Sequence, residues 1–266
     1  NVVVLRQIAD EGHTVGRSLK GIKLDTSDRE DLERYIDVTR GELFFSKGVI
    51  LVEGDAEKFL LPTLAKLYDE SLDFDAMGIT VCSIAGTNFA PYVQLLGPKG
   101  LDIPFVVLTD FDPKKEDASQ EDADPDDAGV TDSYGKNRVV NQIMQHLLDE
   151  EVWEETNYAE VLKLAPHYGV FLNEFTFEID VFKAGAEDHF LAAIKGLTTN
   201  KKMHARFASL ATDPDSLDPS QFLKDIDSIG KGRMAQRLAA VLMKEDVDVC
   251  PEYIESALNY LKAKLG

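Results

Sequence analysis

The chain has little cysteine, no long apolar run and none of the common phosphate-binding or hydrolase motifs. Its 266 residues contain two cysteines, Cys82 and Cys250, and no Cys-x-x-Cys pair. This excludes a disulfide scaffold and a cysteine zinc site, and it favours a reducing cytoplasm. No segment approaches the ~20 apolar residues of a membrane span, so we expect no membrane partner. Because the chain starts at Asn1 without methionine or signal peptide, we expect upstream sequence to be missing.

Positive charge is also scarce. Lysine and arginine total 28 against 48 aspartates and glutamates, which gives a net charge of −20 at pH 7. A surface of this sign repels DNA, RNA and anionic membranes. A function on nucleic acid therefore requires either cations that reverse the charge locally or another part of the molecule that does the binding. The alternative is that the excess is an ordinary solvated surface.

Strand and helix patterns alternate in the first half of the chain. Residues 48–52 form an apolar, β-branched run that is typical of a strand covered on both faces. An amphipathic helix is expected at 56–68, a strand at 79–84, a short helix at 89–96 and a strand at 103–108. This order predicts an α/β fold with a mostly parallel sheet flanked by helices.

The second half changes class. A helix is expected at 139–148 and a fourth strand at 168–172. Further helices are expected at 187–195, 202–211, 219–226, 231–244 and 251–263. The change predicts a smaller all-α C-terminal domain after the α/β domain.

We therefore divide the chain at residues 40 and 185. Residues 1–40 are expected to be a connecting segment, residues 41–185 a catalytic domain, and residues 186–266 a helical domain. The stretch 113–132 holds eight acidic residues and almost no large apolar ones, which predicts a mobile insertion or lid. Its acids do not fit the register of an EF-hand calcium loop.

Acidic residues follow two of the expected strands. Glu53 and Glu57 come after the strand at 48–52, and Asp110 and Asp112 come after the strand at 103–108. In open α/β sheets, ligands bind at this edge. Four carboxylates in one site repel each other unless protons or divalent ions lie among them, and an all-oxygen set suits Mg²⁺ or Mn²⁺. Taken alone, Glu53 and Glu57 are more simply explained as a charge pair at a helix N-terminus, and the alternative for Asp110 and Asp112 alone is an Asx-turn.

These residues resemble a known family. The strand-end acids are similar to those of the TOPRIM domain, which topoisomerases, primases and certain nucleases share. The fuller pattern resembles the OLD (overcoming lysogenization defect) nucleases of class 2 and covers roughly residues 30–245. The segments that carry it are residues 34–40, 44–49, 49–57, 83–89, 107–112, 171–180 and 230–235. The resemblance implies a TOPRIM-type fold.

The resemblance also implies roles for individual residues. It makes Glu53 the TOPRIM glutamate, which is a metal ligand or alternatively a general base, and it makes Lys231 the lysine that contacts the scissile phosphate. The implied metal ligands are Glu53, Glu57, Asp110, Asp112, Glu178 and Asp180, with Glu174 as a weaker member. Arg233 and Arg237 lie on the same expected helix as Lys231 and are weaker candidates for DNA contact. Without the resemblance, Lys231 reads as a surface lysine.

The implied function is cleavage of DNA by a prokaryotic, cytoplasmic endonuclease. Two divalent ions, Mg²⁺ or Mn²⁺, would act on the scissile phosphate, and Ca²⁺ is expected to bind without supporting cleavage. OLD proteins carry an upstream ATPase domain, so we expect ATP control and any homo-oligomerisation to involve that domain.

Two other functions remain open at this stage. One is a topoisomerase- or primase-like TOPRIM enzyme, although no separate domain with a nucleophilic tyrosine is visible. The other is a non-catalytic acidic module or phospho-relay that binds metal at Asp110. That module would need a lysine at the end of the last strand, and we cannot place one there.

Overall fold

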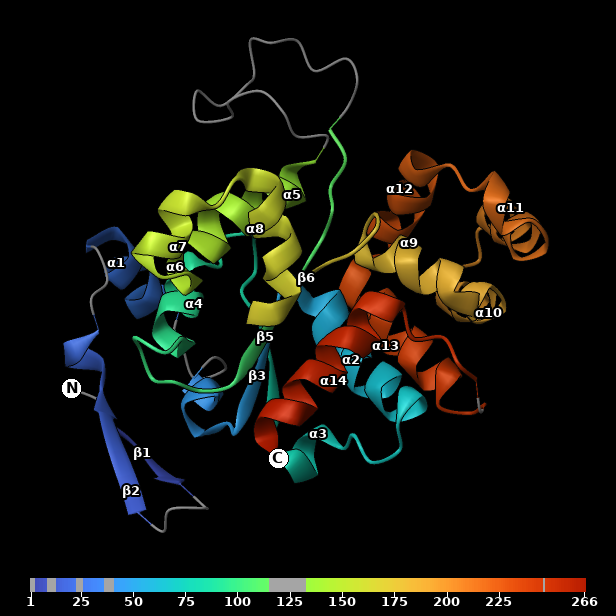
Figure 1. Cartoon of the computed structure of the whole chain (residues 1–266). Coiled ribbons are helices and arrows are strands. Elements are labelled where there is room, and N and C mark those ends of the chain that lie inside the picture. The colour runs from blue at the N-terminus through green and yellow to red at the C-terminus, as the bar shows by residue number, and fades with distance from the viewer. Residues whose placement is uncertain (1–2, 9–12, 23–25, 36–40, 115–132, 246) are drawn as a thin grey trace.

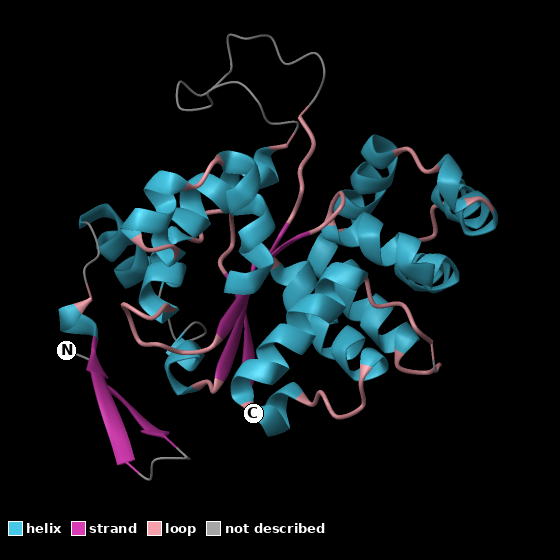
Figure 2. Ribbon diagram, viewed as in Figure 1, coloured by secondary structure: helices cyan, strands magenta, loops and turns pink. Residues whose placement is uncertain are grey.

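A four-stranded parallel sheet lies at the centre of the computed structural model (Figure 2). The structure describes residues 3–8, 13–22, 26–35, 41–114, 133–245 and 247–266. In spatial order, the strands are β4 (Ile79–Ser83), β3 (Gly48–Val52), β5 (Phe105–Thr109) and β6 (Val170–Leu172). The predicted α/β class and parallel sheet are thus confirmed.

Strand β3 is buried along its whole length because both faces of the sheet are covered. Alternate side chains point to opposite faces. Ile50 and Val52 belong to one hydrophobic cluster, whereas Val49 and Leu51 belong to a second. The continuous apolar run in the sequence therefore reflects two cores that meet at one strand.

The helix that follows β3 and the helix that follows β5 cover opposite faces (Figure 1). Helix α2 (Asp55–Tyr68) packs in the first cluster with α13 (Lys231–Leu242) and α14 (Glu252–Leu265). The helical stretch that begins with α5 (Tyr134–Arg138) packs in the second. Neighbouring strands whose connections leave in opposite directions open a crevice at their carboxyl ends. That crevice lies between β3 and β5, where Glu53 and Asp110 emerge.

The second face is covered by short helices. The predicted helix at 139–148 is in fact a composite, since it starts earlier, at Tyr134, and contains a π-helical stretch. Its elements and their neighbours are α4 (Ala90–Leu96), α5 (Tyr134–Arg138), η4 (Val139–Met144), α6 (Gln145–Leu147), α7 (Glu150–Glu155), α8 (Tyr158–Leu164) and η5 (Ala165–Tyr168). Of the predicted acidic insertion at 113–132, the structure describes only Pro113 and Lys114. The other residues of the insertion lie outside the described ranges, which resume at Ser133.

The N-terminal segment carries a β-hairpin. The apolar run at residues 2–5 corresponds to β1 (Val3–Ile8), which pairs antiparallel with β2 (His13–Ser18). The sequence did not predict β2, because the side chains from His13 to Ser18 are mostly polar. Short helices follow at η1 (Leu19–Gly21), α1 (Thr26–Tyr35) and η2 (Gly41–Phe45), and α3 (Phe74–Met77) precedes β4.

The C-terminal part is helical, as predicted. Its elements are α9 (Phe177–Val181), η6 (Phe182–Ala186), α10 (Glu187–Leu197), α11 (Lys201–Thr212), η7 (Pro214–Ser216), α12 (Pro219–Ile229), α13 (Lys231–Leu242) and α14 (Glu252–Leu265). Phe182 lies at the centre of an aromatic cluster with Phe190, Phe207 and Phe222. One hydrophobic cluster runs from the sheet into these helices, and the domain boundary near residue 185 stays a prediction. None of the described helices is long and apolar enough to cross a membrane.

Candidate metal centre

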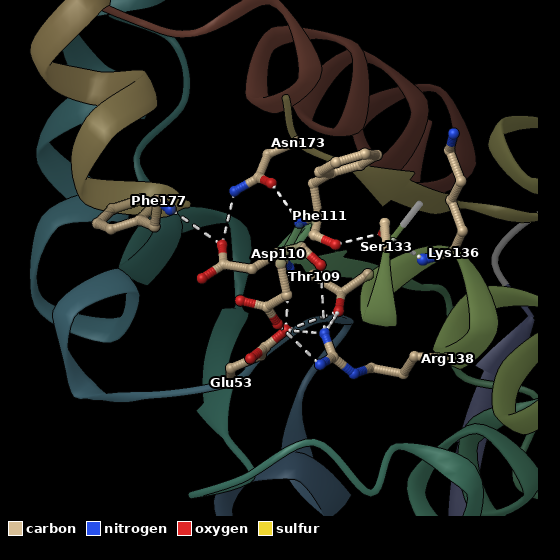
Figure 3. Close-up of polar contacts among 10 residues, drawn as sticks. Glu53, Thr109, Asp110, Phe111, Ser133, Lys136, Arg138, Asn173 and Phe177 are labelled. Atoms are coloured by element: carbon tan, nitrogen blue, oxygen red, sulfur yellow. Dashed lines mark hydrogen bonds and ion pairs between the residues drawn. The ribbon is translucent and has the colours of Figure 1, made fainter. Parts of the chain in front are cut away.

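Glu53 leaves the end of β3 and is held by donors from the neighbouring strand (Figure 3). Its Oε1 accepts hydrogen bonds from Thr109 Oγ1 at 2.6 Å and from the Asp110 amide at 2.9 Å. The same oxygen forms an ion pair with Arg138 Nη1 at 2.6 Å. Parallel pairing of β3 with β5 explains this contact, because it brings the two strand ends together. The Oε1 atom of Glu53 thus contacts all three of these donors.

Asp110 and Asp112 lie on the loop after β5. Asp110 Oδ1 accepts hydrogen bonds from Asn173 Nδ2 at 2.6 Å and from the Phe177 amide at 2.9 Å. Asp112 has a left-handed backbone (φ 49°), which aspartate tolerates better than most residues, and its Oδ2 pairs with Arg138 Nη2 at 2.9 Å. Arg138 therefore bridges Glu53 and Asp112.

Two further carboxylates come from helix starts. Glu57 lies in the first turn of α2 and is 8% exposed, and Glu178 lies in the first turn of α9 and is 6% exposed. Glu178 pairs with Lys231 Nζ at 3.2 Å. Lys231 is the first residue of α13, which packs against α2, and this packing carries the ammonium to the site.

The electrostatics show that these groups share one environment. Burial, followed by repulsion from Glu178 and Glu53, raises the pKa of Glu57 to about 7. Burial and repulsion from Glu53, Glu57 and Glu178 raise the pKa of Asp110 well above its usual value. Burial also raises the pKa of Glu53, although Arg138 opposes the shift. Five carboxylates at one edge of the sheet thus carry more negative charge than their partners neutralise.

Lys231 responds in the opposite direction. Burial alone would lower the pKa of its ammonium, but Glu178, followed by Asp110 and Asp227, outweighs that effect, and the pKa is raised. The lysine therefore stays charged at neutral pH, next to the carboxylates.

Asp180 is the nearest of the other predicted residues, since burial and the charges of Asp110, Asp180 and Glu57 together raise the pKa of Tyr253 well above its usual value. Asp180 Oδ2 accepts hydrogen bonds from the Glu174 amide at 3.0 Å and the Phe175 amide at 3.2 Å, so it orders the loop before α9. Burial raises the pKa of Asp180 to about 6. Glu174 is exposed on that loop, and Arg233 and Arg237 are exposed on α13.

Sequence reasoning missed three residues at the site. No sequence pattern marks Arg138 as a site residue, because its partners Glu53 and Asp112 are distant from it in the chain. Asn173 directly follows β6, so the strand-end rule that located Glu53 and Asp110 applies to it as well. Thr176 is buried beside Phe177, and its hydroxyl has no hydrogen-bond partner in the described part of the chain.

The donor set fits a hard divalent cation. Its ligands are carboxylate oxygens, which suit Mg²⁺ or Mn²⁺, and Glu57 and Asp110 form no ion pair with any residue that the structure describes. Within the described ranges, no three acidic, histidine or cysteine side chains yet converge closely enough to hold an ion. In this arrangement, Glu53 and Asp112 contact Arg138, and Glu178 contacts Lys231.

Comparison with known proteins identifies the same region. Residues 44–112, which contain Glu53 and Asp110, match the family described as overcoming lysogenization defect protein-like, TOPRIM domain. The chain is 27% identical over 250 residues to Endonuclease GajA of Bacillus cereus (strain HuB5-5). That match covers 90% of this chain and 34% of GajA, so the chain spans about a third of the relative's length.

Solved structures extend the match to most of the chain. The C-terminal region of the Burkholderia pseudomallei OLD protein is 38% identical, with a TM-score of 0.70, and the match covers 84% of this chain and 100% of that one. The C-terminal region of the Xanthomonas campestris pv. campestris OLD protein is 39% identical, with a TM-score of 0.66, covering 85% and 96% respectively. The chain therefore belongs to the OLD family and corresponds to the C-terminal region of its members.

Proposed function

We propose that this chain is a divalent-metal-dependent DNA endonuclease that hydrolyses phosphodiester bonds with two bound ions. The observation that carries the proposal is the gathering of five carboxylates and one lysine at the crevice between β3 and β5. A buried excess of negative charge at a ligand-binding edge calls for cations, and those cations would attract a phosphate. The relationship to a protein named as an endonuclease supports this assignment.

Each residue then has a role. The ligands that would hold the ions are Glu53, Glu57, Asp110, Asp112 and Glu178, after rotation of the side chains that now face Arg138 and Lys231. When bound, the ions supply the Lewis acidity that lowers the barrier to attack on phosphorus. Lys231 neutralises charge that develops on the phosphoryl oxygens, and the N-terminus of α13 adds to its field.

The finer assignments are part of the same proposal. Asp180 and Glu174 would complete the metal site only if the loop before α9 moves, and Arg233 and Arg237 would contact the DNA backbone. Glu53 as general base remains the alternative to Glu53 as ligand. The chain spans about a third of the length of GajA. We therefore also propose that an upstream ATPase domain belongs to the whole protein, and that control by ATP and oligomerisation involve that domain. A cytoplasmic location is a further proposal, which the low cysteine content of the sequence favours.

A plasmid-nicking assay tests the proposal. The chain should nick supercoiled plasmid with Mg²⁺ or Mn²⁺ and remain inactive with Ca²⁺ or EDTA. Glu53→Gln and Lys231→Ala should each lower the rate by a factor on the order of a hundred or more. Lys262→Ala is the matched control, because it breaks a comparable lysine–carboxylate pair, with Asp69 at 2.7 Å, outside the site. Equal cutting by all three variants would contradict the proposal.

The same preparations separate the other functions. A covalent protein–DNA adduct would indicate a topoisomerase-like enzyme. Labelling of Asp110 by a small phosphodonor, without nicking, would indicate a phospho-relay. The residue after β6 is Asn173, whereas a phospho-relay needs a lysine there, so the geometry favours the nuclease.

A further inference from the structure

Arg138 is the most deeply buried cation at the site. Its side chain is 8% exposed, and it contacts one oxygen of Glu53 and one oxygen of Asp112 through different nitrogens. Nη1 also donates to Thr109 Oγ1 at 2.6 Å and to the Asp110 carbonyl at 3.3 Å. The guanidinium thus contacts two of the carboxylates proposed to hold metal ions, and Figure 3 shows it beside Glu53.

The start of α5 fixes Arg138 in this place. The Tyr134 amide donates to the Asp112 carbonyl at 3.0 Å, and the Gly135 amide donates to the Phe111 carbonyl at 3.0 Å. Ser133 caps the helix by accepting from the Lys136 amide at 3.0 Å, and its hydroxyl bonds the Phe111 carbonyl. Arg138 follows one turn later, so these contacts fix the position of its backbone beside the loop after β5.

The rest of the site is different. Within the described residues, the Asp110 carboxylate accepts hydrogen bonds from the neutral donors Asn173 Nδ2 and the Phe177 amide, and neither Asp110 nor Glu57 forms an ion pair. Arg138 therefore neutralises Glu53 and Asp112 by direct contact, and Lys231 pairs with Glu178. Glu57 and Asp110 feel the charge of Lys231 without a direct ion pair to a described residue. An arginine stays charged at any pH that the protein tolerates, so its neutralisation of Glu53 and Asp112 is permanent.

We propose that Arg138 is a built-in counter-cation that competes with divalent ions for Glu53 and Asp112. The free protein then takes one ion tightly, beside Glu57 and Asp110, and holds a second ion only weakly, beside Glu53 and Asp112. A fixed positive charge a few ångströms from a cation site opposes binding, and the oxygens that bond Arg138 are engaged already. The inference rests on the proposed two-ion function and adds an order of occupancy to it.

Manganese binding tests this inference directly. Titration of the metal-free chain with Mn²⁺, followed by electron paramagnetic resonance and calorimetry, should give one tight site and a second site at least ten times weaker. In Arg138→Gln the affinity of the weaker site should rise at least tenfold. In Arg138→Lys, which keeps the charge, that affinity should stay within threefold of the wild type.

Arg206→Gln is the matched control. It breaks a two-contact ion pair with the buried Asp225, at 2.7 and 2.5 Å, between α11 and α12. It should leave both Mn²⁺ affinities unchanged. The metal-free Arg138→Gln chain should also melt at a lower temperature than the wild type. Mn²⁺ should then raise the melting temperature of Arg138→Gln by more than it raises that of the wild type.

Three results would overturn the inference. The weaker affinity in Arg138→Gln could stay the same or fall, the lysine variant could gain as much affinity as the glutamine variant, or Arg138→Gln could fail to fold even with Mn²⁺ present. Nicking separates this failure from that of the proposed function. If wild type binds Mn²⁺ as described but does not cut DNA, only the function fails, and if it cuts while Arg138→Gln binds like wild type, only the role of Arg138 fails.

Discussion

The carboxyl group of Glu57 is buried at the start of α2 and forms no ion pair with a described residue. Burial, then repulsion from Glu178 and Glu53, raises its pKa from 4.5 to about 7. Between pH 4.5 and about 7, the Glu57 carboxyl therefore keeps its proton in the folded protein but has lost it in the unfolded chain. Stability must fall as pH rises through this window, because the unfolded state binds fewer protons.

We expect the metal-free wild type to lose up to roughly 3 kcal/mol more stability than Glu57→Gln between pH 5 and pH 8. Urea unfolding in EDTA at the two pH values measures the difference. With Mg²⁺ present the loss should shrink, because an ion replaces the proton. If wild type and Glu57→Gln show parallel pH dependence, the burial of an uncompensated Glu57 is wrong.

At the scale of single elements, the contact between α5 and the loop after β5 holds the site in shape. A Cβ at Gly135 would lie 2.0 Å from the Asp110 carbonyl oxygen and 2.8 Å from that of Phe111. Only glycine permits this approach, which places Arg138 against Glu53. The site therefore depends on a helix whose own sequence shows no acidic or catalytic residue.

Gly135→Ala should push α5 away from the loop and destabilise the chain by about 1–3 kcal/mol, the range for an overpacked site. It should also shift the loop that carries Asp110 and Asp112, two of the proposed metal ligands, and so lower nicking. Gly41→Ala serves as the control, since no described atom lies within 4 Å of its added Cβ, and should change stability by less than about 0.5 kcal/mol. A Gly135→Ala chain with wild-type urea midpoint and activity would show that the close approach is unimportant.

The elements also show what a sequence can predict. Strand ends located Glu53, Asp110 and Asp112, because parallel strands bring their carboxyl ends to one edge whatever the helices between them do. Arg138 escaped prediction because its pairing with Glu53 depends on the packing of a helix 85 residues further on. The hairpin strand β2 escaped because its polar side chains carry no periodic apolar signal.

At the scale of the whole molecule, charge and site are linked. The chain carries a net charge of −20, and some of its carboxylates are concentrated at the site. There Arg138 and Lys231 offset part of their charge. Lys231 comes from the helical C-terminal part and Arg138 from the opposite face of the sheet, so the site needs both hydrophobic clusters in place. Family resemblance located Lys231, which no local pattern distinguishes from a surface lysine. Bound cations are what would let such an acidic molecule approach DNA.

Anomalous diffraction from crystals of the chain soaked in Mn²⁺ gives the most direct test of a shared metal centre. We expect an anomalous peak beside Asp110 and Glu57, coordinated by oxygens from both, and at higher Mn²⁺ concentration a second peak beside Glu53 and Asp112. Peaks at other acidic surfaces, with none in the crevice between β3 and β5, would contradict the assignment of this cluster as a metal centre.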